Sequence, residues 1–355
     1  MALNYGSDNK SALEAKYDAQ KIAFAPIMFQ AALSLRNLGI LELVKNSRKG
    51  ISIEDVAVQL NLPVYGVKVL LEAGLSLEVV RVEDNLFYLT KTGWFILNDE
   101  LTRVNMDFTQ DVNYMGMFTL EESVKKGKPT GLKVFGNWST IYEALSELPE
   151  HVQKSWFGFD HFYSDYAFPE IMQLVFRNNP SRILDVGGNT GKFALQCVKY
   201  NNKVKVTILD LPGQLAKAAV NIKQAGFEGR VDMFAIDLLD HSKPFPENPD
   251  VIWMSQFLDC FSQEDISGLL RRSKEAMSKD SSLYILETYW DMQLYEASTY
   301  SLHATSLYFT NIANGCSQMY HSDDMRKLIK KSGLILAEEI SDIGVSHTLF
   351  ICKLP

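Results

Sequence analysis

After Pro180 the sequence alternates between short apolar runs of strand character and amphipathic runs of helical period. Strands separated by helical crossovers form parallel sheets that carry helices on both faces. We therefore expect an α/β fold with a Rossmann-like parallel sheet over residues 171–355. The expected strands cover 182–186, 205–210, 231–237, 251–255, 283–288, 335–340 and 348–353, and the expected helices cover 191–200, 212–225, 263–278, 296–312 and 322–332.

Ligands of such sheets bind beyond the carboxyl ends of the strands, so the residues that follow each strand are the candidate site. Asp185 lies at the end of the first strand and is followed by the glycine turn 187–191, GGNTG. Asp210 closes the second strand, where a carboxylate can accept hydrogen bonds from a ribose diol. Asp237 and Leu238 follow at the third strand, where an adenine could lie. Together these residues predict a cofactor that contains a nucleoside.

The glycine turn distinguishes between two such cofactors. A dinucleotide site has the pattern GxGxxG, whose second glycine lets a pyrophosphate approach the backbone. Here Asp185 stands two residues before the glycines, and its charge would repel a pyrophosphate but attract an ammonium group. S-adenosyl-L-methionine (SAM) has an ammonium group, a charged sulfur and no phosphate. The residues therefore favour SAM over NAD.

Residues 25–99 have the pattern of a winged helix: helices, a tight turn at 61–63, a second helix at 65–72 and a hairpin around 83–85. DNA recognition would need Arg, Lys, Asn or Gln on the second helix. That helix offers one cation, Lys68, among several valines, and the chain has a net charge of −8. We therefore expect this module to form a subunit interface, and we do not expect it to bind nucleic acid.

Residues 106–170 are expected to form a helical connector between the module of residues 1–105 and the α/β domain. The connector is rich in aromatic residues, which either pack between the domains, cover a flat apolar ligand, or do both. These residues are Trp138, Tyr142, Trp156, Phe157, Phe159, Phe162 and Tyr163.

Several classes of protein are not expected from this sequence. The four cysteines are scattered without a CxxC pair, which predicts reduced thiols and a cytoplasmic location. The N-terminus has no apolar signal region, and no run reaches about 18 apolar residues, so neither secretion nor a membrane span is expected. No metal site is proposed, because Asp237 and Asp240 are too few ligands for one.

At this point the chain resembles the SAM-dependent O-methyltransferases of the plant and bacterial small-molecule type, which include the caffeate and hydroxyindole enzymes. The resemblance covers nearly the whole chain. It is carried in order by the segments ALSLRNLGILELV, YLTKTG, ILDVGGNTGKF, ILDLPG, AIDLL, and FSQEDISGLLRR leading to YILET.

The resemblance implies a winged-helix domain that forms a homodimer, followed by a SAM-binding domain. It also implies a small aromatic or apolar methyl acceptor, with a hydroxyl as the expected acceptor group, and S-adenosyl-L-homocysteine (SAH) as the second product. The cofactor-binding residues that it implies are Ser164, Asp185, Gly187, Gly188, Asp210, Leu211, Asp237, Leu238 and Ser255.

The resemblance fails at the residues that handle the proton. The family usually carries His-Asp-Trp after the fourth strand, and its histidine deprotonates the acceptor. Here Asp259-Cys260-Phe261 stands in that place. Glu287 matches the first of two glutamates that position the base, whereas Ser317 replaces the second and Ser255 replaces a lysine that touches the adenine.

Three hypotheses follow. Asp259 could be the base, although an ordinary aspartate with a pKa of about 3.9 is a weak one unless burial raises that value. The enzyme could instead work mainly by proximity, since orientation alone can contribute about 7–11 kcal/mol; the loss of two proton-handling residues favours this hypothesis. In the third, the chain is a catalytically silent ligand sensor or a winged-helix regulator. A purely structural role also stays open for both acids. Asp259 could be an acid at a helix N-terminus, and Glu287 could be an ordinary carboxylate at a strand end.

Overall fold

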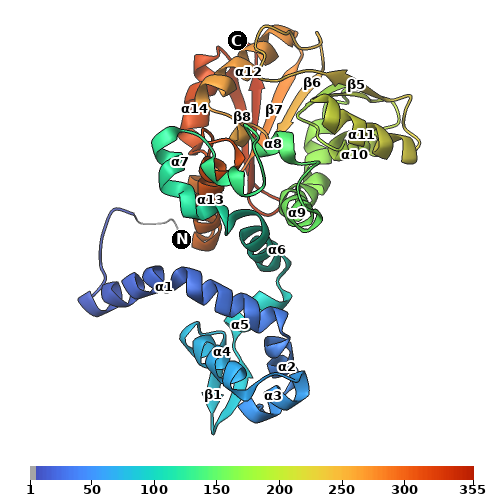
Figure 1. The fold of residues 1–355 in the computed structure, drawn as a ribbon. Helices are drawn as coiled ribbons and strands as arrows, with labels where there is room; N and C mark the ends of the chain where they lie inside the picture. Colours follow the sequence, from blue (N-terminus) through green and yellow to red (C-terminus); the bar gives the residue numbers. More distant parts are fainter. Residues whose placement is uncertain (1–4) are drawn as a thin grey trace. The chain divides into compact units, whose positions relative to one another are not determined.

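The computed structural model describes residues 5–355, which form two compact units of residues 5–110 and Asp111–Pro355. Figure 1 shows both units, and each is described here by itself. The connector expected at 106–170 falls within the larger unit from residue 111 onward, and its last helix, α9 (Glu150–Phe176), continues past residue 170.

The smaller unit contains the helices and the hairpin that the sequence predicts. Ser52 accepts a hydrogen bond from the Asp55 backbone and so begins the third helix. The two strands pair antiparallel across a turn at Asp84 and Asn85, both of which have positive φ. The elements are α1 (Ala12–Asn37), α2 (Ile40–Asn46), α3 (Ile53–Leu60), α4 (Val64–Ser76), β1 (Val80–Glu83), β2 (Leu86–Leu89), α5 (Lys91–Asn98) and α6 (Glu100–Phe108).

Two groups of apolar side chains in the smaller unit bear on its role. One group is fully buried and forms its core; this group includes Leu35, Ile40, Leu41, Val56 and Leu71. The other lies on α1 and is between 50% and 80% exposed: Leu13, Tyr17, Ile22, Phe24 and Ile27.

No single helix within residues 5–355 is both long and apolar enough to cross a membrane. Helices α1 and α2 taken together are long and apolar enough, but they are bent by 58° at the break between them.

The larger unit is built on a seven-stranded sheet with the strand order β5-β4-β3-β6-β7-β9-β8. The first five strands in this order are parallel, as predicted. The last two differ from the prediction, because β9 pairs antiparallel with both β7 and β8. Only residues 344–346 separate β8 from β9, and so short a connection can form a hairpin but no crossover. The strands are β3 (Arg182–Val186), β4 (Lys205–Asp210), β5 (Val231–Ala235), β6 (Val251–Ser255), β7 (Ser282–Glu287), β8 (Ile335–Ile343) and β9 (His347–Lys353).

Helices cover both faces of this sheet, as Figure 1 shows and as the sequence predicts. Helices α9, α10 (Lys192–Tyr200) and α11 (Pro212–Gln224) pack on one face, where the indole of Trp253 stacks on Phe193 with ring centroids 4.3 Å apart. Helices α12 (Gln263–Ala276) and α14 (Ser322–Lys331) pack on the other. This double cover buries the strands and leaves their carboxyl ends to form a site.

The helix expected at 296–312 is interrupted. Helix α13 (Glu296–Tyr308) is followed by a π-helical turn, η6 (Phe309–Ala313). The turn contains Asn311, which is fully buried; its amide donates to the Gly116 carbonyl at 2.8 Å and accepts from the Ser123 hydroxyl at 2.7 Å. These bonds attach the preceding connector to the end of α13. The connector holds η1 (Thr109–Asn113), η2 (Gly116–Thr119), α7 (Leu120–Lys126), η3 (Thr130–Val134) and α8 (Ile141–Ala144).

Candidate functional site

A pocket opens where the chain order of the strands reverses, between β3 and β6 at their carboxyl ends. Five of the predicted cofactor residues line it together: Ser164, Asp185, Gly187, Gly188 and Ser255. The other four predicted residues lie at or just beyond the ends of β4 and β5 and do not line this pocket: Asp210, Leu211, Asp237 and Leu238. The position of the pocket at the switch point is the one at which open α/β sheets bind nucleotides.

Asp185 is the buried acid of this pocket. It is 2% exposed, and its Oδ2 has no hydrogen-bond partner among the described residues. Burial, together with the nearby charge of Asp210, raises the pKa of Asp185 to about 8. A cationic group placed beside it would satisfy the unpartnered oxygen and lower that pKa. The ammonium group of SAM is such a group, so the pocket fits the cofactor.

The glycine turn lies tightly against this acid and against the next strand. A Cβ atom on Gly188 would lie 2.5 Å from Asp185 Oδ2, closer than real Cβ contacts. Gly187 has a φ of +73°, and a Cβ there would lie 2.3 Å from the ring of Phe257. The turn therefore requires glycine at both positions. At Gly188 only the lack of space requires it, and at Gly187 both the lack of space and the left-handed backbone require it.

Asp210 and the residues around it lie at the adjoining strand ends. Asp210 Oδ1 accepts from the Leu211 backbone at 2.7 Å, and its Oδ2 accepts from Asn189 of the glycine turn at 2.8 Å. Burial raises its pKa. Strand β5 ends at Ala235, so Asp237 lies two residues beyond the strand that was expected to include it. Its Oδ1 accepts from the backbone of Leu239 at 2.9 Å.

Two apolar residues of the predicted set differ in exposure. Leu238 is buried, and its carbonyl accepts from Arg272 at 2.8 Å, whereas Leu211 is partly exposed at the start of α11. The backbone of Ile236 donates to the Asp210 carbonyl at 3.0 Å, so the ends of β4 and β5 are adjacent.

Asp259 lies on a short 3₁₀ helix, η4 (Leu258–Cys260), directly after β6. It is 7% exposed, and burial raises its pKa to about 6. The Cys260 thiol donates to Asp259 Oδ1 at 3.4 Å. Asp259 is the acid in the first turn of η4 and precedes α12, which Ser262 caps by accepting from the Asp265 backbone.

Glu287 at the end of β7 holds the turn that carries Asp259. Its Oε1 accepts from the backbone N–H groups of Phe257 at 3.0 Å and Leu258 at 2.8 Å. The side chain is 2% exposed, and its Oε2 has no hydrogen-bond partner among the described residues. Burial and the Asp259 charge raise the pKa of Glu287. Glu287 is thus more than a strand-end carboxylate, since two backbone groups of the neighbouring loop depend on it.

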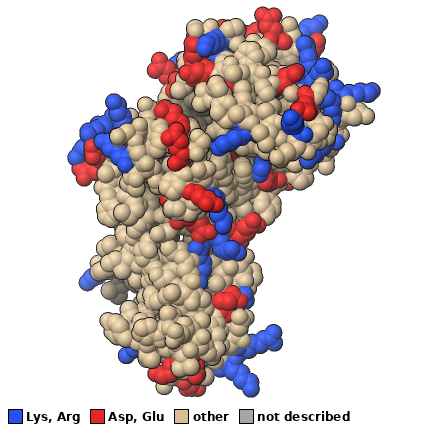
Figure 2. Space-filling model, turned by 45° about the vertical axis from the view of Figure 1, so that its right-hand side comes forward, with Lys and Arg blue, Asp and Glu red and all other residues tan. Residues whose placement is uncertain are grey.

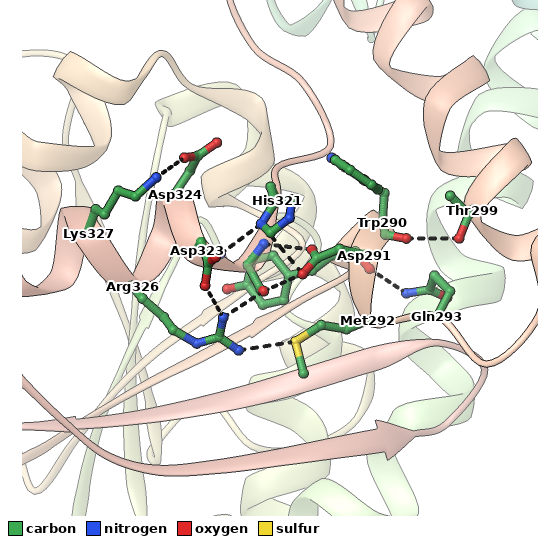
Figure 3. A network of polar contacts seen from close by, with 12 residues as sticks. Trp290, Asp291, Met292, Gln293, Thr299, His321, Asp323, Asp324, Arg326 and Lys327 are labelled. Carbon is green, nitrogen blue, oxygen red and sulfur yellow. Dashed lines mark hydrogen bonds and ion pairs between the residues drawn. The ribbon is translucent and has the colours of Figure 1, made fainter. Parts of the chain in front are cut away.

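The chain after Glu287 is anchored by the polar network in Figure 3. Asp291 of η5 (Trp290–Met292) accepts from both the backbone and the hydroxyl of Ser322, at 2.7 and 2.5 Å. Arg326 donates to Ser322 Oγ at 2.8 Å and to the sulfur of Met292 at 3.6 Å. The network therefore fixes the segment that follows β7 to helix α14.

Aromatic side chains of the connector and of α13 surround the η4 turn. Trp156 Nε1 donates to the Tyr308 hydroxyl at 2.7 Å. The pKa of Tyr142 is raised mainly by burial, with further contributions from Cys260, Tyr308 and Asp259. The Ser317 hydroxyl donates to Asn314 Oδ1 at 3.0 Å, and Asn314 Nδ2 donates to the Cys260 carbonyl at 2.7 Å. These two bonds connect Ser317 to the η4 turn.

Among the pocket residues that sequence analysis did not assign are Asp160, Lys192 and Gln256. Gln256 has a φ of +46°, and its Oε1 contacts Nε2 of the fully buried His347 at 3.0 Å. Lys192 follows the glycine turn directly, and that position is the signal that could have identified it. Within residues 5–355 no group of three or more His, Cys, Asp or Glu side chains could hold a metal ion.

Comparison with known proteins gives two family matches. The Dimerisation2-like domain matches residues 16–87, and the O-methyltransferase domain matches residues 118–335. The L-tyrosine C(3)-methyltransferase of Streptomyces lavendulae is 23% identical over 271 residues, which are 75% of this chain and 73% of that protein.

Two solved structures share the fold. The SAM-dependent methyltransferase SibL in its apo form has a TM-score of 0.73 at 22% identity, covering 94% of this chain and 98% of that one. Human N-acetylserotonin methyltransferase in complex with SAM has a TM-score of 0.65 at 17% identity, covering 99% of each chain.

The glycine turn generates a prediction about stability. Gly187→Ala should lower the free energy of unfolding by about 2–4 kcal/mol, because it adds left-handed strain and a clash with Phe257. Urea denaturation would measure the change. Gly213→Ala on α11 is the matched control, since its Cβ would meet nothing within 4 Å and the helix should gain up to about 1 kcal/mol. Equal stability of the two variants would contradict the assigned geometry of the turn.

Proposed function

The chain belongs to the O-methyltransferase family and is a SAM-dependent methyltransferase; on this premise we propose that it methylates a hydroxyl group of a small aromatic or apolar molecule, with Asp259 as the general base. The observation that carries the proposal is the placement of Asp259. It is a buried carboxyl group on the turn after β6, and the Glu287 side chain holds that turn in position.

SAM supplies a methyl group on a positively charged sulfur, from which a nucleophile displaces it in line, leaving SAH. We propose that Asp185 binds the ammonium group and that Ser164 lies near the methionine portion. Asp210 would accept hydrogen bonds from the ribose. The adenosine would further contact Leu211, Asp237, Leu238 and Ser255, and the Gly187-Gly188 turn would allow its close approach.

The ribose assignment can be tested by binding. Asp210→Ala should weaken SAH binding by about 1.5–3 kcal/mol, because a hydrogen bond to a charged group is lost. Calorimetry measures the affinity, and Asp232→Ala, which removes an exposed acid from β5, is the control that should change nothing. Asp210 also supports Asn189 and Leu211, so the melting temperature is recorded and Asp210→Asn serves as a milder variant. Unchanged SAH affinity in a folded Asp210→Ala protein would contradict the assignment.

The base would act by taking the proton of the acceptor hydroxyl onto a carboxylate oxygen of Asp259 as the new bond to the methyl group forms. At pH 7 a carboxyl group with a pKa of about 6 is mostly ionised. It is also about a hundredfold stronger as a base than one with a pKa near 3.9. The burial of Asp259 therefore favours the base hypothesis over the proximity hypothesis that the sequence favoured.

A phenol would suit this arrangement. Deprotonation of a phenol places negative charge on the oxygen and on neighbouring ring carbons, so one base can serve either methylation outcome. The name of the Streptomyces relative assigns its methyl group to a carbon of tyrosine. Products of a phenol panel, analysed by mass spectrometry and NMR, would show which atom receives the methyl group. SAM binding without transfer to any phenol, thiol or amine would favour the silent ligand sensor.

The role of Asp259 gives a prediction with a pH dependence. Asp259→Asn should lower kcat by about 10²–10⁴-fold while SAM affinity stays unchanged, because the proton acceptor is removed at constant size. In the wild type, kcat/KM should rise tenfold per pH unit up to about pH 6, as the carboxyl ionises, and then level off. The variant should lose this rise. Asp280→Asn, an exposed change, is the control. A loss below about tenfold would instead support catalysis by proximity.

We further propose the division expected from the sequence, in which residues 1–105 form the dimerisation domain, 106–170 contribute to the acceptor pocket and 171–355 bind the cofactor. The homodimer would form through α1, whose exposed apolar side chains are unusual for a free surface. The face shown in Figure 2 carries both acidic and basic side chains and broad uncharged areas, which does not favour nucleic acid as the partner.

The dimer can be tested by light scattering. The 40.2 kDa chain should give about 80 kDa at micromolar concentration. Ile22→Glu, which places a charge among the exposed apolar residues of α1, should shift the mass toward that of a monomer. Val220→Glu on α11 of the larger unit is the control with a similar change of an exposed residue. A wild-type mass near 40 kDa would contradict the proposal.

A further inference from the structure

Asp160 is an acid of the donor pocket to which neither the sequence nor the proposed mechanism gives a role. It lies on α9 one turn before Ser164 and lines the same pocket as Asp185. Gln256 Nε2 donates to its backbone carbonyl at 3.4 Å, so the segment that carries it is tied to the turn after β6. The Asp160 side chain is 29% exposed, which leaves its carboxylate accessible from the pocket.

No Lys or Arg of the described chain forms an ion pair with this acid, although the Lys192 charge partly offsets the burial that raises its pKa. The imidazole of His161 lies 3.9 Å from Asp160 Oδ2, but burial lowers the pKa of His161 to about 4, so the ring is neutral at pH 7. Lys192 also lines the pocket, but it is paired with Asp165 at 2.8 Å. Asp160 therefore contributes negative charge to the pocket without a cation of its own.

Two more acids lie nearby. The charge of Asp259 adds to the effect of burial in raising the pKa of Asp160 to about 7. Glu287 stands behind Asp259, and its Oε2 is buried without a hydrogen-bond partner among the described residues. Close unpaired carboxyl groups are costly to bury, and that cost falls when a cation binds beside them.

Aromatic groups also lie near Asp160 and Asp259. Tyr308 and the buried Trp156 are joined by their hydrogen bond, and the charges of Asp160 and Asp259 both raise the pKa of Tyr308. Electron-rich ring faces next to carboxylates are the usual surroundings of small organic cations in proteins.

We propose that Asp160, with Asp259 beside it, binds a small organic cation at the wall of the donor pocket. The inference rests on the proposed SAM site and goes beyond it. Such a cation has two possible sources: the charged sulfur of SAM, or a protonated amine on the methyl acceptor. If the sulfur is the source, the site distinguishes SAM from its neutral product and thereby favours the release of SAH after transfer. If the amine is the source, the acceptor is an aromatic molecule that carries an alkylammonium group.

The first arm of the test compares SAM with SAH, which lacks the positive charge on sulfur. Calorimetry gives the ratio of the SAH dissociation constant to that of SAM, for the wild type and for Asp160→Asn. If the sulfur is bound, the ratio should fall by about fivefold or more in the variant, through weaker binding of SAM alone.

The second arm uses tyramine and 4-ethylphenol, which share a phenol ring and a two-carbon arm and differ in the ammonium group. Both are titrated in the presence of saturating SAH. If an acceptor amine is bound, the wild type should prefer tyramine by about fivefold or more, and Asp160→Asn should lose that preference.

Glu150→Gln is the matched control, because it removes a negative charge from the same helix at an exposed residue that does not line the pocket. It should leave both ratios unchanged. Asp160→Asn should keep the melting temperature of the wild type, and Asp160→Ala provides a second variant in which the ratios should change in the same way. A change in either arm supports the proposal and identifies the source.

The proposal is overturned if neither ratio depends on Asp160, and this includes the case in which neither phenol binds and the SAM to SAH ratio stays constant. That result differs from a failure of the proposed function, in which the wild type would bind neither SAM nor SAH.

Discussion

The bonds from Glu287 to the backbone of Phe257 and Leu258 connect the two halves of the site. They bring the end of β7 against the loop after β6 and fix where Phe257 lies. The Phe257 ring in turn fills the space beside Gly187, so the glycine turn of the donor pocket packs against the same loop. The buried Glu287 side chain thus sets the spacing between the glycine turn and Asp259. The two N–H groups satisfy Oε1 of an acid that is costly to bury and whose pKa burial and the Asp259 charge raise.

Much of this arrangement could be predicted from the sequence because it follows from local pattern. The strand ends at Val186 and Asp210 were predicted to the residue, since apolar runs of strand character stop where glycine or polar residues begin. The GGNTG turn likewise marked the pocket, because its glycines follow directly after the apolar run of β3. The antiparallel end of the sheet could have been expected from the short spacing between its last two strands, a signal that a pattern of alternating strands and helices concealed.

The remaining features depend on contacts between distant residues. Gln256 adopts a positive φ, and its side chain contacts His347, 91 residues away. Asn311 joins η6 to a segment almost 200 residues earlier, and no local propensity predicts a π-helical turn there. Asp160 lies on a helix whose aromatic residues suggested a wall of the pocket, but its place in the pocket that Asp185 also lines depends on how α9 packs against the sheet. Burial, which decides the pKa of Asp259, is likewise a property of the folded chain.

If Asp259 is the base, as we propose, the charge that the site carries through the reaction differs from that of a site with a histidine base. A histidine base becomes positive when it takes up a proton, whereas an aspartate becomes neutral. Burial opposes the ionised form of Asp259, and its charge repels those of Glu287 and Asp160, whose pKa values it raises. Uptake of a proton relieves that repulsion, which strengthens the base at the step where it is needed. The same repulsion would weaken if a cation stayed bound beside Asp259. A site of this kind therefore works best when its cation is lost together with the proton transfer, as happens when a positively charged sulfur gives up its methyl group and becomes neutral.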